Sequence, residues 1–341
     1  MFKSLFNWIA EPLSGYSGMV DKPTPSITVH SIPRDTVFRP TRFAEYIGQT
    51  KAKDILLNTY MKAVRERSIT MPHVLLYGSA GCGKTTLARI IANELGVSFR
   101  EIVTSTIKDT EEILSIIDYV DGGVVFVDEV HGIPRELAES IYTIMEDFKY
   151  NGVLIKPFTL IGATTELGEL IQTRKPFVDR FKICLELSDY TIDELTVLLK
   201  QYRYIRFPND ILPVEVYITI AENCRKTPRI GISLLEACVY SKGDIQRALT
   251  NSNIIIGGYT IKDLEILKYL SDAPVNSKGI RTGIGLLGIA SYLGTSVTNY
   301  TQVLEPYLLR NNLITRTPRG RCLSIAGEIK IKELELALNV K

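Results

Sequence analysis

The chain has 341 residues, of which 45% are hydrophobic and 23% charged, which is ordinary for globular proteins and long enough for two or three small hydrophobic cores. Its formal net charge of +2 at pH 7 is too small to coat a nucleic acid by bulk electrostatics. Contact with DNA would therefore need a local basic cluster.

The five cysteines are widely spaced and never form a C-x-x-C pair, so neither a disulfide framework nor a zinc site is expected. No apolar run reaches the roughly 18 residues of a membrane span, and the first apolar stretch ends at Glu11, too early for a secretory signal. We expect reduced thiols and a cytosolic protein.

Residues 1–33 carry clusters of Gly, Ser and Pro without sustained periodicity, which predicts a loose arm. Across residues 34–190, short apolar runs alternate with amphipathic stretches. This alternation predicts an α/β domain with a parallel sheet and helices on both faces. The expected strands are VLLY at 74, VSFREI at 97, VVFV at 124, FTLIGA at 158 and ICLEL at 183.

Residues 191–272 lose the strand signals and show helical periodicity, which predicts a second, all-helical domain. Residues 273–341 begin with turn residues and continue as helix, turn and helix, followed by the β-prone ITRTPRGRCLSI. This order predicts a winged-helix domain with a short basic wing. Its turn region carries Arg316, Arg319 and Arg321, three guanidinium groups suited to DNA phosphates or the minor groove. A solvated basic hairpin is the alternative.

The strongest motif is GSAGCGKT, from Gly78 to Thr85, which fits G-x-x-x-x-G-K-T at every fixed position. It follows a predicted strand and precedes a predicted helix, as a phosphate-binding loop requires. Gly81 and Gly83 allow backbone amides to surround a β-phosphate. Lys84 adds a charge toward the β- and γ-phosphates, and the Thr85 hydroxyl can hold Mg²⁺. The sequence therefore predicts an ATP site.

A second motif, VVFVDEVH, is an apolar strand that ends in two acids. We expect Asp128 to hold Mg²⁺ through water and Glu129 to orient or deprotonate the attacking water. Without the phosphate loop, a solvated turn would be the better interpretation. The segment LIGATTELGEL also ends a strand, and its Thr164 and Thr165 are candidate sensors of the γ-phosphate, although lone threonines are more often caps. His131 is expected to be a local hydrogen-bonding residue.

In chain order, RFAEYIGQ, the phosphate loop, VVFVDEVH, MEDF, PFTLIGATT, DRF, TPRI and EPYLLRNNLITRTPRGR resemble the RuvB family of Holliday-junction branch-migration ATPases. The resemblance covers about residues 38–325. It implies an AAA+ P-loop domain, a helical lid and a winged-helix domain, with ATP and Mg²⁺ as cofactors.

The resemblance also implies roles for single residues. Arg180 would be an arginine finger that acts on the nucleotide of a neighbouring subunit, which implies a ring, taken to be a hexamer. Arg229 would be the second sensor, and Tyr190 would approach the nucleotide where the domains meet. A surface ion pair with Asp179 is the alternative for Arg180. The remaining residues implied at the nucleotide or the intersubunit site are Phe38, Arg39, Tyr46, Ile47, Thr86, Glu146, Asp147 and Phe148.

The chain departs from the family between MEDF and PFTLIGATT. Only the eight residues 149–156 stand there, whereas the family carries a longer β-hairpin that docks RuvA. These residues are expected to form at most a short stub, so partnership with a RuvA-like adaptor is doubtful.

The resemblance thus implies an ATP-dependent motor on double-stranded or branched DNA that drives branch migration in recombination and repair. A DNA-bound ATP switch of the replication-initiator type is the main alternative, and Glu129 with Arg180 favours turnover over switching. A clamp-loader-like ATPase is a third possibility, disfavoured because the chain ends in a basic wing.

Overall fold

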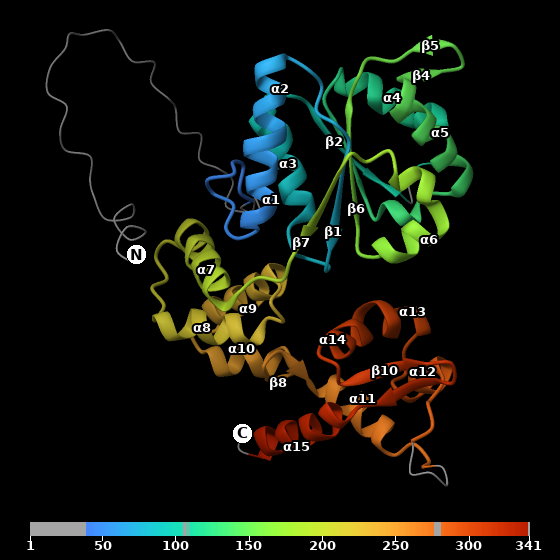
Figure 1. Ribbon diagram of the computed structural model, residues 1–341. Coiled ribbons are helices and arrows are strands. Elements are labelled where there is room, and N and C mark those ends of the chain that lie inside the picture. Colours follow the sequence, from blue (N-terminus) through green and yellow to red (C-terminus); the bar gives the residue numbers. More distant parts are fainter. Residues whose placement is uncertain (1–38, 105–106, 108, 276–280, 340–341) are drawn as a thin grey trace, which may run out of the picture. The chain divides into compact units, whose positions relative to one another are not determined.

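The computed structural model describes residues 39–104, 107, 109–275 and 281–339 (Figure 1). The predictions for residues 1–33 and for Phe38 lie outside the described residues. In the part of the chain that is described, no helix is long and apolar enough to cross a membrane.

A five-stranded parallel sheet forms the centre of the N-terminal half, in the order β2-β3-β6-β1-β7. The strands are β1 (Val74–Gly78), β2 (Phe99–Val103), β3 (Val124–Asp128), β6 (Thr159–Thr164) and β7 (Ile183–Leu187). All of them lie on the predicted apolar runs. The central strands β3, β6 and β1 are buried on both sides, as a sheet covered on both faces requires, whereas the edge strands β2 and β7 also carry exposed residues. The predicted parallel α/β core is confirmed.

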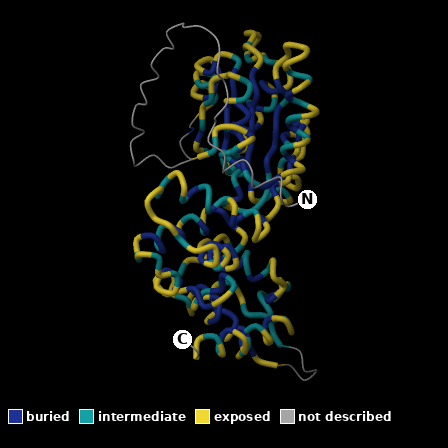
Figure 2. Tube along the Cα trace, turned by 90° about the vertical axis from the view of Figure 1, so that its left-hand side faces the viewer, coloured by how far each residue is buried: buried dark blue, intermediate teal, exposed yellow. Residues whose placement is uncertain are grey.

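Successive strand residues point to opposite faces of this sheet. Val74 and Leu76 of β1 pack on one side, and Leu75 packs on the other. The residues of the central strands β3, β6 and β1 are mostly buried (Figure 2). The helices with residues in the first cluster are α1 (Thr50–Asp54), η1 (Ile55–Met61), α2 (Lys62–Arg67) and α3 (Lys84–Leu95). Those with residues in the second are α4 (Thr110–Val120), η3 (Val130–Gly132), α5 (Arg135–Asp147) and α6 (Leu167–Val178).

A short hairpin follows α5 and is made of β4 (Lys149–Tyr150) and β5 (Val153–Leu154). Asn151 and Gly152 form its turn with φ of 47° and 81°, the left-handed backbone that a two-residue type I′ turn requires. The sequence prediction of at most a stub is confirmed, and the exposed β5 residues are apolar.

The helices α7 (Ile192–Arg206), α8 (Val214–Asn223), α9 (Pro228–Tyr240) and α10 (Ile245–Asn251) form a separate helical unit, here called the lid. A capping box between Thr191 and Glu194 begins α7, since the hydroxyl and the carboxylate satisfy backbone N–H groups that the first turn leaves free. Buried residues of all four helices share one cluster, which includes Leu199, Ile220 and Leu235.

The elements after α10, here called the winged-helix part, surround another cluster. They are β8 (Ile254–Ile256), β9 (Tyr259–Thr260), α11 (Ile261–Ser271), α12 (Leu286–Tyr292), α13 (Val297–Asn299), η4 (Tyr300–Leu304), α14 (Glu305–Arg310), β10 (Ile314–Thr317), β11 (Gly320–Leu323) and α15 (Ile325–Asn339). The wing is the antiparallel pair of β10 and β11, and Ile284 bridges to Arg321 on its other edge.

Helix α11 packs with these C-terminal elements, since Leu264 and Leu267 share a cluster with Leu308 and Leu334. The sequence predicts this helix at the end of the lid, in residues 191–272. Helical periodicity shows that a helix has an apolar face, but it does not show which neighbours that face contacts.

Candidate nucleotide site and nucleic-acid interface

The predicted phosphate loop connects β1 to α3. Gly81 and Gly83 have φ of 78° and 101°, a backbone conformation that favours glycine. A Cβ atom at Gly83 would lie 2.5 Å from the Tyr46 hydroxyl oxygen, and one at Gly81 would lie 2.9 Å from Cγ2 of Thr227. Any side chain at either glycine would therefore displace its neighbours.

Lys84 is the first residue of α3 and its side chain is buried. Its Nζ donates hydrogen bonds to the carbonyl oxygens of Gly78 at 2.9 Å and of Ser79 at 3.1 Å. Thr85 and Thr86 follow in the first turn of the helix and are half-buried. The loop thus combines an ammonium group with the amino terminus of a helix, an arrangement that binds phosphate.

The two acids stand at the carboxyl end of β3. Asp128 Oδ1 accepts a hydrogen bond from the Glu129 amide at 3.0 Å, and Glu129 has a φ of 48°. The Glu129 carboxylate accepts a hydrogen bond from the Thr165 hydroxyl at 3.2 Å and lies 3.3 Å from Nδ1 of His131. Because β1 and β3 are both parallel neighbours of β6, these acids share the sheet edge of the phosphate loop.

Thr164 ends β6 and is fully buried. Its hydroxyl oxygen accepts a hydrogen bond from the Glu166 amide at 3.0 Å and lies 3.0 Å from Nδ1 of His131. His131 therefore sits between Thr164 and Glu129 as a local hydrogen-bonding residue, as expected.

Tyr46 borders the loop, and Tyr190 lies beside Tyr46. The Tyr46 hydroxyl donates a hydrogen bond to the Gly83 carbonyl oxygen at 3.3 Å. Burial raises the pKa of Tyr46 well above its usual value and that of Tyr190 to about 12, so both hydroxyls keep their protons at neutral pH. Ile47 is half-buried beside Tyr46, and Arg39 is exposed.

Arg229 lies on α9 of the lid and faces the loop. A Cβ atom at Gly81 would be 3.1 Å from Cβ of Arg229 and 3.7 Å from its Nε. Two polar residues beside the loop were missed by sequence reasoning. They are Thr227, and Asp189, whose Oδ1 accepts a hydrogen bond from the Ser79 hydroxyl at 3.2 Å. Their place in the chain, next to Arg229 and Tyr190, was the available signal.

Arg180 forms an ion pair with Glu146 and lies 5.9 Å from the centre of the Tyr142 ring. The alternative for Arg180, an ion pair with Asp179, is not formed, because Arg180 pairs with Glu146 instead. Asp147 ends α5, and the Phe148 ring packs 5.9 Å from the ring of His73. The residues from Glu146 to Phe148 therefore link Arg180 to the body of the domain.

The three wing arginines differ in exposure. Arg319 occupies the turn between β10 and β11 and is exposed, and the side chain of Arg316 is 60% exposed. The Arg321 side chain is only 12% exposed and pairs with Glu305, which is fully buried. Arg316 also reaches Glu305, with 2.9 Å between Nη2 and Oε2. Arg321 therefore faces the interior, and its burial does not favour the predicted contact with DNA.

The fold and these motifs match known proteins. Residues 38–187 match the family model of the Holliday junction DNA helicase RuvB P-loop domain, and residues 257–332 match the RuvB C-terminal winged helix domain. The Holliday junction branch migration complex subunit RuvB of Phytoplasma mali is 34% identical over 306 residues, covering 83% of this chain and 89% of the relative. That of Acholeplasma laidlawii is 34% identical over 305 residues, with 84% and 89% coverage.

Solved structures agree. The Thermotoga maritima RuvB Holliday junction branch migration motor has a TM-score of 0.74 at 31% identity, covering 86% of this chain and 98% of that chain. The Aeropyrum pernix ORC2 protein shares the fold, with a TM-score of 0.55 at 16% identity and coverage of 90% of this chain and 97% of that chain. With relatives of this identity over most of its length, and with both family models matched in order, the chain belongs to the RuvB family.

Proposed function

We propose that this protein is an ATP-driven motor that moves the branch point of four-way DNA junctions during recombination and repair. The observation that carries the proposal is the meeting of the Lys84 loop with Asp128 and Glu129 at one edge of the sheet. The names of the relatives supply the substrate, since they are branch migration complex subunits.

The nucleotide would lie along the loop. Its phosphates would meet the amino terminus of α3 and the Lys84 ammonium group. Tyr46, Ile47 and Tyr190 would border it, and Arg229 would approach from the lid. Phe38 and Arg39, at the start of the domain, complete the residues proposed for the base and ribose.

Thr85 and Asp128 suit Mg²⁺, because both offer oxygen atoms and this ion typically takes one or two protein ligands and keeps several waters. When bound, the ion would neutralise charge on the β- and γ-phosphates. Glu129 accepts hydrogen bonds from Thr165, which would hold its carboxylate ready to orient water. Thr164 would sense the γ-phosphate.

Arg180 would complete the site of a neighbouring subunit, with Glu146, Asp147 and Phe148 at the same border. A guanidinium group supplied across an interface stabilises charge in phosphoryl transfer. The protein would therefore work as a ring, for which we propose a hexamer.

DNA would contact the wing through Arg316 and Arg319, whose exposed guanidinium groups suit phosphates and carry little sequence information.

We propose an ATPase domain to about residue 190, followed by the lid. We also propose that the winged-helix domain begins near residue 255, since α11 packs with the C-terminal elements.

A RuvA-like adaptor would meet only the hairpin of β4 and β5, whose strands have two residues each. We therefore propose that this chain acts with another adaptor or with none.

A DNA-bound ATP switch is the second candidate, because ATP bound at the Lys84 loop and DNA bound at the wing would not by themselves require repeated hydrolysis. Glu129 and Arg180 favour turnover. To separate the two, ATP hydrolysis is measured without DNA, with linear duplex and with a synthetic four-way junction, while strand products are scored in parallel and Glu129→Gln serves as the control.

A motor is expected to hydrolyse ATP faster with DNA and to resolve the junction into its arms, whereas the Glu129→Gln variant does neither. Nucleotide binding with hydrolysis that ignores DNA, and no movement of strands, would overturn the motor and support the switch.

A further inference from the structure

A buried ion pair joins the lid to the winged-helix part. Arg225, which follows α8 of the lid, pairs with Asp263 on α11. The Arg225 side chain is 14% exposed and that of Asp263 is fully buried. This ion pair therefore lies buried between the lid and the winged-helix part, each of which has its own hydrophobic core.

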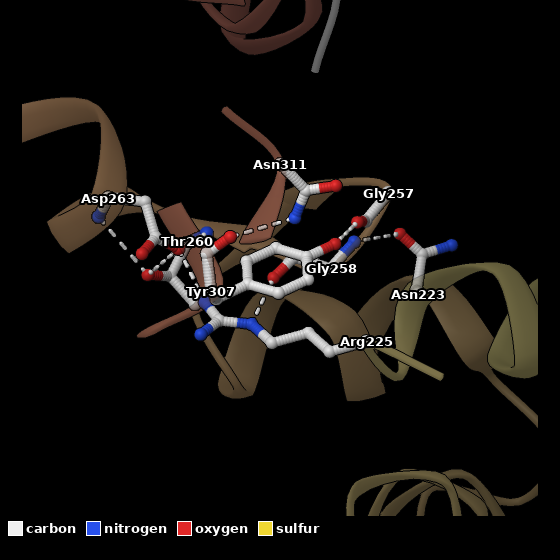
Figure 3. A network of polar contacts seen from close by, with 8 residues as sticks. All are labelled: Asn223, Arg225, Gly257, Gly258, Thr260, Asp263, Tyr307 and Asn311. Atoms are coloured by element: carbon white, nitrogen blue, oxygen red, sulfur yellow. Dashed lines mark hydrogen bonds and ion pairs between the residues drawn. The ribbon is translucent and has the colours of Figure 1, made fainter. Parts of the chain in front are cut away.

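Further contacts hold the Arg225 guanidinium group on the winged-helix side (Figure 3). Its Nε donates a hydrogen bond to the Gly258 carbonyl oxygen at 2.8 Å, and its Cζ lies 4.4 Å from the centre of the Tyr307 ring. The Tyr307 hydroxyl donates in turn to the Gly257 carbonyl oxygen at 2.8 Å. A guanidinium group can lie over an aromatic ring while it donates hydrogen bonds in two directions, a combination that arginine provides and lysine does not.

Asp263 depends on this partner. Its Oδ2 accepts hydrogen bonds from the Thr260 amide at 2.6 Å and the Thr260 hydroxyl at 2.7 Å. Burial raises the pKa of Asp263, and the charge of Arg225 opposes that rise. A buried carboxylate that loses its cation is left with an uncompensated charge. Separating the lid from the winged-helix part would leave Asp263 without its cation, so the ion pair favours keeping the two parts in contact.

The turn that carries Arg225 also borders the nucleotide site. Arg225 and Lys226 have φ of 54° and 56°, which is uncommon backbone for side chains of this kind. The Tyr190 amide donates to the Lys226 carbonyl oxygen at 3.4 Å. Thr227 and Arg229, next along the chain, approach Gly81 of the phosphate loop.

We propose that Arg225 is a positioning residue that couples the nucleotide site to the winged-helix part. The pair with Asp263 and the contact with Tyr307 make the turn before α9 and the winged-helix part move as one rigid body. A movement of Arg229 on ATP hydrolysis would then also move the DNA-binding wing. This inference rests on the proposed function only for its use on DNA, because the rigid connection itself can be measured without DNA.

The first test measures coupling in the full-length protein. Arg225→Ala and Asp263→Asn are compared with wild type and with Arg203→Ala. Arg203 is the matched control, because its Nε donates to the Tyr217 hydroxyl at 3.1 Å within the lid alone. Asp263→Asn keeps an oxygen for Thr260 and removes only the charge, so it remains informative if Arg225→Ala folds poorly.

We expect both Arg225→Ala and Asp263→Asn to hydrolyse ATP without DNA within about two-fold of wild type, but to consume about ten-fold more ATP per junction resolved. Arg203→Ala should keep the wild-type ratio. An unchanged ratio in both variants at the pair, or an equal rise in Arg203→Ala, would overturn the coupling role.

The second test needs no motor activity. Spin labels at cysteines introduced at Gln246 and Lys332, both exposed, report the distance from α10 to α15 when the exposed Cys184 and the half-buried Cys322 are replaced by serine. Wild type should give one narrow distance distribution, the same with ADP and with a non-hydrolysable ATP analogue, and Arg225→Ala should broaden it.

A distribution that is already broad in wild type, or one that stays narrow in Arg225→Ala, refutes the rigid connection. If the wild-type protein moves no junction while the distances behave as expected, the proposed function has failed and the connection stands.

Discussion

Glu305 is expected to control the stability of the wing. Glu305 is the first residue of α14 and its side chain is fully buried. Its carboxylate forms ion pairs with Arg316 and Arg321, one from each wing strand. The substitution Glu305→Gln keeps the shape and one acceptor oxygen but removes the charge. The Arg321 guanidinium group, 12% exposed, would then be left without its counterion.

Removing one partner of a buried ion pair typically costs about 3–5 kcal/mol. The lower end applies here, because the glutamine oxygen still accepts one hydrogen bond and Arg316 can turn to solvent. A local loss of about 3 kcal/mol corresponds to roughly a 100-fold higher rate of amide exchange, at 1.36 kcal/mol per factor of ten.

Hydrogen exchange followed by mass spectrometry measures this on peptides that cover β10 and β11. Peptides from β1 and β6 should keep their wild-type exchange, because they belong to another core. The matched control is Glu328→Gln, since Glu328 pairs with Arg281 at 2.9 Å near the surface, where an ion pair contributes about 1 kcal/mol or less. A wing that exchanges less than about ten-fold faster in Glu305→Gln would refute the argument that the buried charge holds it.

Three further outcomes are expected. Arg180→Ala should lower ATP hydrolysis by about 10³-fold, and mixing it with Lys84→Ala subunits should restore part of the activity, because some interfaces then combine an intact loop with an intact finger; full activity of Arg180→Ala alone would exclude a finger. Burial lowers the pKa of His73 to about 4, below the about 6.5 of an unfolded histidine. The unfolded chain therefore binds more protons between these values, so stability that is complete above pH 6.5 should fall by up to roughly 3 kcal/mol toward pH 4. Denaturant titrations should show a flatter pH dependence in His73→Gln, and equal slopes would contradict the assignment. Arg319→Ala should weaken duplex binding regardless of sequence and reduce the salt slope by about 1, whereas Arg247→Ala on the lid should match wild type.

The motifs that could be predicted are those in which local sequence sets the geometry. The phosphate loop is one, because Gly81 and Gly83 supply left-handed backbone within the loop itself. The acids at the end of β3 are another, because an apolar run followed by Asp128 and Glu129 marks both the strand and its end.

The contacts that could not be predicted join residues far apart in the chain. Arg321 was expected at the DNA, but Glu305 lies sixteen positions earlier and turns it inward. A glutamate at the start of a helix is also common for electrostatic reasons, so nothing marked Glu305 as a buried partner. The pairing of Arg225 with Asp263 spans thirty-eight positions. The packing of α11 likewise depends on contacts with residues far along the chain.

The hairpin of β4 and β5 makes the protein a suitable recipient for grafts. Its ladder pairs Lys149 with Leu154 and Tyr150 with Val153 around a two-residue turn. Residues added in matched numbers to each strand would lengthen the ladder without changing its register, and additions of two per strand would also keep each side chain on its present face. A longer hairpin could thus be inserted at Asn151 and Gly152, which would test whether this one element is enough to recruit an adaptor.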